Sequence, residues 1–256
     1  MLIYILFFTL IGSVFSLIGG IVLLFKEKLA LRISHLLFSF AAGTLLGTAF
    51  FDLLPEAASN AADAASNASK NINIFLWALI GFLFFFLIER FIHWFHHHHE
   101  HPAEPALKPT VALITLGDSV HNFIDGVAIA ASFLVNIPLG IVTSLAVAAH
   151  EIPQEIGDFS ILLHKGVDRK KVLLLNLLSS AAAIVGAVLT FLMADFVTGL
   201  LPVFLSVTAG FFIYIAASDL IPEIHEKNKA GFAFIESFLL ILGIFAIWVF
   251  VSLLGR

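Results

Sequence analysis

The sequence predicts an all-α membrane protein with eight transmembrane helices. Of its 256 residues, 60% are hydrophobic and 12% are charged, and the mean hydropathy of +1.05 is typical of polytopic membrane proteins rather than of soluble domains. Apolar stretches of about 20 residues, the length that crosses ~30 Å of hydrocarbon, recur along the chain. We therefore expect one transmembrane domain in a lipid bilayer, with no room for a soluble domain and no nucleic-acid partner.

The apolar stretches give the expected helices in order. They span residues 2–25, 33–54, 73–95, 110–134, 137–163, 172–197, 200–221 and 232–254. The first lacks a basic start and a small-residue cleavage site, so we expect it to remain as a membrane helix rather than to be removed as a signal peptide. Residues 56–72 consist mainly of Ala, Asn and Ser, a composition that predicts a flexible outer loop.

The basic residues predict the orientation. When alternate loops are assigned to opposite sides, only Lys70 and Arg256 fall on one side. The other side receives Lys26, Lys28, Arg32, Arg90, Lys108, Lys165, Arg169, Lys170, Lys171, Lys227 and Lys229. Because Lys and Arg concentrate in cytoplasmic loops, both termini should lie outside the cytoplasm. We expect a multi-pass protein of the cell (inner) membrane.

An internal repeat relates the second and seventh predicted helices at an offset of 167 residues. Eight of eighteen positions match without a gap. The matching residues are Ser39, Ala42, Gly43, Ala49, Asp52, Leu53, Pro55 and Glu56, repeated as Ser206, Ala209, Gly210, Ala216, Asp219, Leu220, Pro222 and Glu223. The two helices cross the membrane in opposite directions, which is typical of transporters with inverted repeats. Three helices on either side of a central pair, a 3+2+3 arrangement, would follow.

The central pair of predicted helices carries polar groups in apolar surroundings, where such groups cost several kcal/mol. In each stretch the spacing of i, i+4 places donors on one helix face. The candidate ligands are His121, Asn122 and Asp125 in the fourth helix, and His150, Glu151, Gln154 and Glu155 in the fifth. Hydrogen bonds between helices are the alternative role for a single buried polar group, but seven on two adjacent helices favour a metal site.

The ligand types restrict the metal. The chain has no cysteine, so imidazole nitrogen with carboxylate and amide oxygen would hold Zn, Fe, Mn, Co or Cd rather than Cu(I). Pro153 lies inside the fifth helix and frees the carbonyl of Ala149, which we expect to face the site. The metal would be a transported substrate, and no cofactor is expected.

A histidine-rich segment follows the third predicted helix. Six of the eleven histidines lie between His93 and His101, and residues 96–109 are predicted to form a cytoplasmic loop. Such a loop could collect metal weakly or act as a polar linker, and the sequence leaves both open.

Two motifs resemble a known family. HNFIDG at 121–126 and HEIPQEIGDF at 150–159 resemble the signature helices of ZIP metal transporters, closest to the LIV-1 branch. The resemblance implies eight helices, a homodimer, and movement of helices 1, 4, 5 and 6 against helices 2, 3, 7 and 8. It implies transport of divalent metal into the cytosol rather than an enzymatic activity.

The resemblance also assigns ligands. It implies a primary site of His121, Asp125, His150 and Gln154, with Asn122 and Glu151 at a neighbouring one. The LIV-1 pattern usually has histidine at position 154. The amide of Gln154 leaves iron and manganese open beside zinc.

Other polar residues are candidates for gates and exits. Asp52 with Glu56 should mark the outer mouth, and Asp219 with Glu223 and His225 the inner mouth. Asp158 could line the exit. Asp118 and Asn176 could support the ligands or bond neighbouring helices.

Two other functions use similar residues. An intramembrane zinc hydrolase would share the His-Glu start of its motif, but position 154 is not its second histidine. A metal exporter would differ only in direction.

Overall fold

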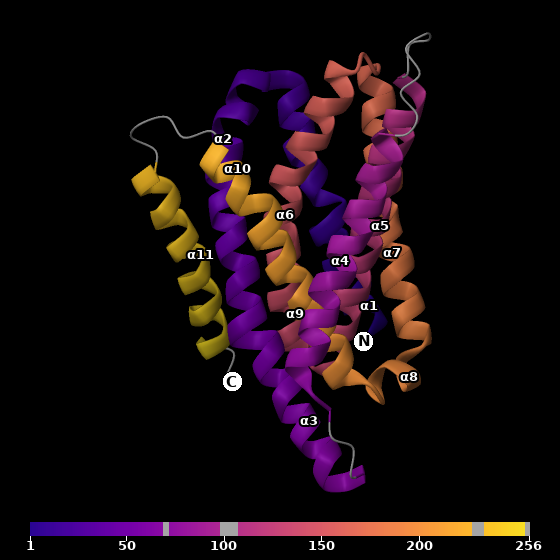
Figure 1. The fold of residues 1–256 in the computed structure, drawn as a ribbon, viewed down its shortest axis with the longest axis vertical. Helices are drawn as coiled ribbons and strands as arrows, with labels where there is room; N and C mark the ends of the chain where they lie inside the picture. Colours follow the sequence, from indigo (N-terminus) through magenta and orange to yellow (C-terminus); the bar gives the residue numbers. More distant parts are fainter. Residues whose placement is uncertain (69–71, 98–106, 227–232, 254–256) are drawn as a thin grey trace.

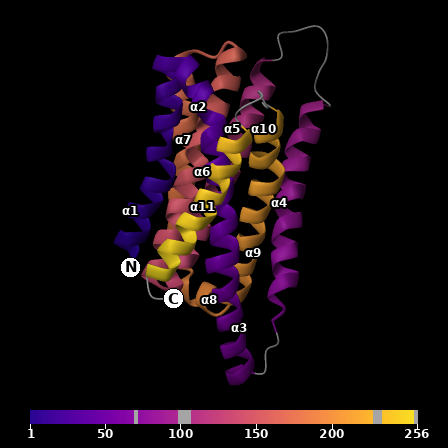
Figure 2. The ribbon, with the colours of Figure 1, turned by 90° about the vertical axis from the view of Figure 1, so that its left-hand side faces the viewer.

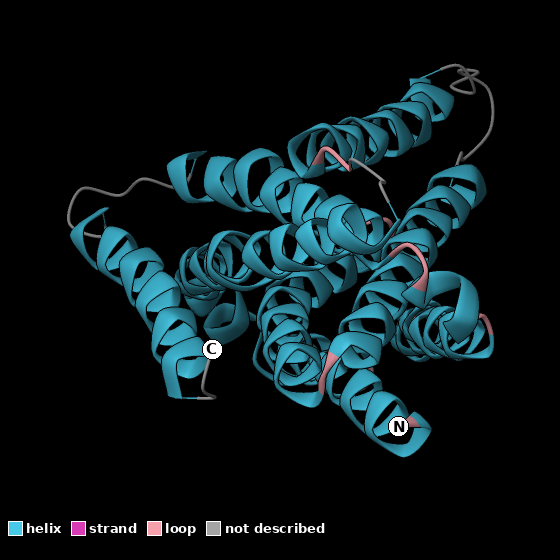
Figure 3. Cartoon of the chain, turned by 90° about the horizontal axis from the view of Figure 1, so that it is seen from below, coloured by secondary structure: helices cyan, strands magenta, loops and turns pink. Residues whose placement is uncertain are grey.

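The computed structural model describes residues 1–68, 72–97, 107–226 and 233–253, and these residues form helices joined by short turns. The prediction of an all-α protein is confirmed. Six described segments are long and apolar enough to cross a membrane: Leu2–Leu31, Leu36–Asp63, Ile74–Phe91, Arg169–Leu192, Leu201–His225 and Ala233–Leu253. Seen end on, the helices pack side by side in a single bundle (Figure 3).

The helices follow the apolar stretches of the sequence, with breaks that the hydropathy pattern does not show. Figure 1 labels most of them. In order they are α1 (Leu2–Ser13), η1 (Phe15–Leu17), α2 (Ile18–Thr48), η2 (Ala49–Leu53), α3 (Leu54–Ala68), α4 (Ile74–His97), α5 (Leu107–Val135), α6 (Ile137–His164), α7 (Arg169–Leu192), α8 (Ala194–Thr198), α9 (Leu201–Tyr214), η3 (Ile215–Leu220), α10 (Ile221–Glu226) and α11 (Ala233–Leu253).

The predicted boundaries of the loop between the first two helices are wrong. Helical structure runs through residues 27–32, and the break falls on Lys26, whose φ of −140° and ψ of 58° are not helical. The reason is local sequence, because Leu29, Ala30 and Leu31 are good helix formers and Ala30 is buried.

The flexible outer loop expected over residues 56–72 is also corrected. Helix α3 continues to Ala68 and extends past one end of the bundle (Figures 1 and 2). Alanine has the highest helix propensity, and the π-helix over residues 49–53 accommodates Pro55, so the helix continues through it. A polar composition therefore did not mean disorder here. Residues 69–71, and 98–106 of the histidine-rich segment, lie outside the described residues.

Both copies of the Asp-Leu-x-Pro-Glu motif contain the same local distortion. Each has a short π-helix immediately before its proline-containing helix, η2 before α3 and η3 before α10. A proline lacks an N–H and its ring pushes away the carbonyl four residues earlier, so the helix widens at that point. Helices α3 and α10 lie toward opposite ends of the bundle (Figure 1).

Glycines allow close backbone contacts in equivalent places. A Cβ on Gly43 in α2 would lie 2.1 Å from the carbonyl oxygen of Leu240 in α11, and one on Gly210 in α9 would lie 2.0 Å from that of Ala78 in α4. Gly210 is 167 residues after Gly43, and Leu240 is 162 residues after Ala78. Helix α2 therefore packs on α11 in the same way as α9 packs on α4.

Candidate metal site

Helices α5 and α6 form a tight antiparallel hairpin that brings the two polar stretches together. Asn136 alone connects them and caps α6, because its side-chain oxygen accepts the N–H of Leu139 at 2.9 Å. His121 is 15 residues before Asn136 and His150 is 14 after it. At 1.5 Å per residue, both histidines lie about 21–23 Å from the turn, at matching heights.

Four side chains meet there. His121 and Asp125 of α5 and His150 and Glu151 of α6 are buried and offer ligand atoms within 4.8 Å of one another. His121 Nε2 lies 3.1 Å from His150 Nε2 and 3.4 Å from Glu151 Oε1. Asp125 Oδ2 lies 3.3 Å from His150 Nε2 and 3.6 Å from His121 Nε2, and the fifth pair, His150 Nε2 with Glu151 Oε1, is 3.7 Å apart.

These spacings suit one small cation. Bonds from zinc to nitrogen or carboxylate oxygen are about 2.0–2.2 Å, so neighbouring ligands of a tetrahedral ion lie roughly 3.3–3.6 Å apart. The five measured separations run from 3.1 to 3.7 Å. No described residue donates a hydrogen bond to either oxygen of Glu151 or to Asn122 Oδ1, although all three atoms are buried. Such oxygens are costly in a protein interior, and a bound cation would compensate them.

The ring of His150 is held for metal binding. Its Nδ1 lies 3.1 Å from the carbonyl oxygen of Ala146, which can only accept a hydrogen bond, so Nδ1 carries the proton of the neutral ring. The lone pair is then on Nε2, the atom that faces the cluster. The ring of Phe85 in α4 packs perpendicular to that of His121, with centroids 5.4 Å apart, and thereby restricts the second imidazole.

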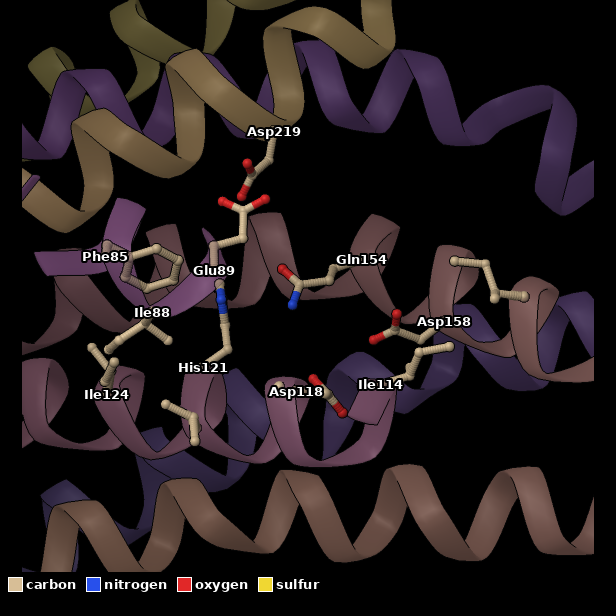
Figure 4. Close-up of a pocket in the computed structure, with 13 residues that line it drawn as sticks. Phe85, Ile88, Glu89, Ile114, Asp118, His121, Ile124, Gln154, Asp158 and Asp219 are labelled. Atoms are coloured by element: carbon tan, nitrogen blue, oxygen red, sulfur yellow. The ribbon is translucent and has the colours of Figure 1, made fainter. Parts of the chain in front are cut away.

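The other three predicted ligands surround this cluster. Asn122 donates to Asp118 Oδ1 at 2.9 Å, and Glu155 accepts a hydrogen bond from Ser180 of α7 at 3.3 Å. Gln154 faces a cavity beside His121 (Figure 4). The structure therefore brings Glu151 into the cluster of four, and it places Gln154 in the lining of the cavity that His121 also lines.

An acidic cavity of about 310 Å³ adjoins the cluster through His121. Its polar lining comes from four elements. It consists of Glu89, Asp118, His121, Gln154, Asp158 and Asp219. In Figure 4 the carboxylates of Glu89 and Asp219 point toward each other, and Tyr214 donates a hydrogen bond to Glu89. From His121 the cavity lining continues along α6 through Gln154 and Asp158 to Ile161, toward the end at which α6 terminates.

The predicted gate residues divide into two groups. Asp118, Asp158 and Asp219 line this cavity. The others lie elsewhere: Asp52 in η2 is 2% exposed, Asn176 donates to the carbonyl of Val172 at 2.8 Å, Glu223 is half-buried and His225 is exposed. The outer mouth assigned to Asp52 and Glu56 stays a prediction. Sequence reasoning missed Glu89, although an acid close to the end of an apolar span was the available signal.

Comparison with known proteins identifies similar sequences. The family model described as ZIP Zinc transporter matches residues 1–108 and 105–251. Zinc transporter ZIP13 of Mus musculus is 30% identical over 260 residues, which cover 87% of this chain and 71% of that protein.

Two further relatives match over shorter regions. Zinc transporter zipt-7.2 of Caenorhabditis elegans is 39% identical over 57% of this chain, and Zinc transporter ZIP10 of Homo sapiens is 36% identical over 54%. These alignments span 32% and 17% of the two relatives, so the chain corresponds to only part of their length.

Proposed function

The chain belongs to the ZIP zinc transporter family, and we propose that it carries divalent transition-metal ions across a membrane into the cytosol, with zinc as the first candidate substrate. The family consists of transporters rather than enzymes, which removes the hydrolase alternative. The observation that carries the proposal is the buried set of His121, Asp125, His150 and Glu151, whose ligand atoms lie at the spacings of a tetrahedral ion.

The ligand chemistry supports zinc while leaving iron, manganese and cadmium as further candidates. Two imidazoles and two carboxylates suit a borderline divalent ion. Similar chains bear the name zinc transporter. Gln154 stands beside the cluster as a neutral amide and adds no third imidazole. Asn122 Oδ1 and Glu155 Oε2 are buried beside the cluster and accept no hydrogen bond from a described residue. The ion could therefore pass to these oxygens instead of being held permanently in the cluster.

Eight spans are part of the proposal. Helices α5 and α6 join the six apolar segments, because their lengths of 29 and 28 residues exceed what the hydrocarbon requires and their polar faces meet each other. The distribution of Lys and Arg supports an orientation with both termini outside the cytoplasm, in the cell (inner) membrane. The acidic cavity would then lie on the cytosolic side of the cluster.

A test of orientation exploits the absence of cysteine. Ser66→Cys should react with a membrane-impermeant thiol reagent from outside intact cells, and Ala103→Cys should react only after the membrane is opened. Labelling of Ala103→Cys in intact cells would reverse the orientation. The cysteine-free parent chain is the control for background labelling.

The inverted 3+2+3 repeat is supported by matching glycine contacts. A Cβ on Gly19 would lie 2.4 Å from the carbonyl oxygen of Ile152, and one on Gly186 would lie 2.2 Å from that of Phe123. Gly186 is 167 residues after Gly19, and Ile152 is 29 after Phe123. The same step of 29 relates His121 to His150. The two-fold relation would therefore pass between the histidines of the cluster.

The glycine contacts also support two bodies that move against each other. One set of close approaches to a carbonyl oxygen joins α5 with α7 and the start of α2 with α6. The other set joins α2 beyond Lys26 with α11, and α4 with α9. These groups correspond to helices 1, 4, 5 and 6, and to helices 2, 3, 7 and 8. Among described glycines, none makes such an approach between the groups. Without such contacts at their boundary, one group of helices could slide along the other.

A homodimer, which the family resemblance implies, completes the proposal, and light scattering of purified protein would give its mass.

Transport by the purified chain in liposomes tests the proposed function. Influx of Zn, Fe, Mn, Co and Cd should be measured in turn, with protein-free liposomes and a His150→Ala variant as controls. We expect zinc influx that requires His150. Absence of flux for every metal, from protein that is folded and inserted, would contradict the proposal.

The acidic cavity gives a separate prediction. Asp219→Asn should lower the maximal rate by about fivefold, because one carboxylate near a passing cation contributes on the order of 1 kcal/mol even in water. Half-saturation should change little, since Asp219 lies beyond the cluster. Asp195→Asn, at an exposed acid in α8, is the charge-matched control. Equal effects of the two substitutions, measured as zinc flux per folded molecule, would remove the exit role.

A further inference from the structure

A second cavity lies on the outside of the bundle, between α5 and the turn that joins α6 to α7. Its volume is about 660 Å³. The α5 wall is formed by Val111, Ala112, Thr115, Leu116 and Ser119; the turn contributes Lys165, and the start of α7 contributes Lys171. We call this cavity the α5–α7 cleft. It is separate from the acidic cavity, because Ser119 lines the cleft whereas its neighbour Asp118 lines the acidic cavity.

The turn fixes the backbone that carries Lys165 and leads into the first turn of α7, where Lys171 lies. Gly166 adopts a positive φ of 77° and its N–H donates to the carbonyl of Leu163 at 2.9 Å. The N–H of Val167 donates to Leu162 at 3.1 Å, so α6 ends in a Schellman motif. Asp168 then caps α7 by accepting the N–H of Lys170 at 3.0 Å. This closed turn places Lys165 and Lys171, both exposed, at the same cleft.

The rest of the cleft is apolar in character. The hydroxyls of Thr115 and Ser119 donate to carbonyls of their own helix, at 3.0 and 2.6 Å, so their single protons are not available to a ligand in the cleft. Leu116 is 57% exposed, and Leu174 and Leu178 continue the exposed apolar surface along α7. A cleft with cationic groups at one end and an alkyl wall along its length matches an amphipathic anion.

We propose that the α5–α7 cleft binds an anionic phospholipid, with the phosphate between Lys165 and Lys171 and an acyl chain along α5 and α7. Basic pockets between membrane helices are suited to such head groups. Charge complementarity favours this occupant. The cleft lining contains two lysines against one acid, Asp168, and the neighbouring Arg169 and Lys170 add to the positive potential. Assignment to the cytosolic leaflet rests on the proposed function, whereas binding itself does not.

Native mass spectrometry of the whole purified chain tests this site, with phosphatidylglycerol and phosphatidylcholine as probes. Phosphatidylglycerol should bind preferentially, and the Lys165→Gln/Lys171→Gln variant should bind it roughly 10- to 30-fold more weakly. Arg169→Gln/Lys170→Gln loses the same charge next to the cleft and should retain most of the binding. Ala112→Trp, which fills the apolar part without a charge change, should also weaken binding.

Three outcomes would overturn the proposal. Equal loss in the two double variants would mean general attraction to a basic surface. Equal binding of the two lipids would remove the role of the anion, and displacement of phosphatidylglycerol by inorganic phosphate at millimolar concentration would assign the lysines to a free anion. Because the readout is binding and not flux, failure here leaves the transport proposal intact.

Discussion

Replacement of His150 by alanine is expected to abolish metal transport. The side chain is fully buried, its Nδ1 is held by the Ala146 carbonyl, and its Nε2 lies 3.1–3.7 Å from three other ligand atoms. Loss of an outer-shell partner of a metal ligand already costs 10–100-fold in affinity or activity, so loss of the ligand itself should cost more. The same result is expected for His121→Ala, Asp125→Ala and Glu151→Ala.

The measurement must separate loss of the ligand from loss of the fold. His164→Ala provides a matched control, because His164 lies on the same helix, also bonds a carbonyl four residues earlier, and is exposed. Zinc binding to purified His150→Ala by calorimetry should fall together with zinc flux. If the four variants insert, retain their thermal stability and keep near-normal uptake, the cluster is not the transport site.

Much of the site could be predicted from sequence because its signals are local. Carboxylates and imidazoles four residues apart in an apolar helix define a face, and a one-residue connection forces two such faces together. His121, Asp125 and His150 follow from that logic. Spacing within either helix does not predict how closely Glu151 and Gln154 approach the other ligands, because the relative rotation of α5 and α6 depends on packing against α7, α2 and α1.

The parts that escaped prediction depend on distant contacts. Glu89 meets Tyr214 across 125 positions of sequence and approaches Asp219 in the cavity, which no periodicity could reveal. Helix α3 escaped for a different reason, since its alanines favour a helix and its polar residues favour a loop. Hydropathy weighs the second property and ignores the first. The break at Lys26 similarly falls inside a continuous helical pattern.

The second large effect is expected from glycine. Gly126→Ala should destabilise the protein, because the added Cβ would lie 1.9 Å from the carbonyl oxygen of Ala183 and only a movement of α7 away from α5 could relieve the contact. Such overpacking costs about 1–3 kcal/mol, which for a protein of this size lowers the melting temperature by roughly 2–12 °C.

Gly157→Ala is the matched control for Gly126→Ala, since Gly157 also lies within a helix of the hairpin but no atom of the described residues lies within 4 Å of its added Cβ. There the substitution should leave stability unchanged or raise it by up to about 1 kcal/mol through higher helix propensity. Gly210→Ala, with its Cβ 2.0 Å from Ala78 O, tests the second body in the same way. Thermal unfolding of the purified variants, followed by light scattering or tryptophan fluorescence, should place Gly126→Ala and Gly210→Ala below the parent chain and Gly157→Ala at or above it. Equal melting temperatures for all three would mean that the helices of each body are not locked by these contacts, and the division into two rigid groups would lose its structural basis.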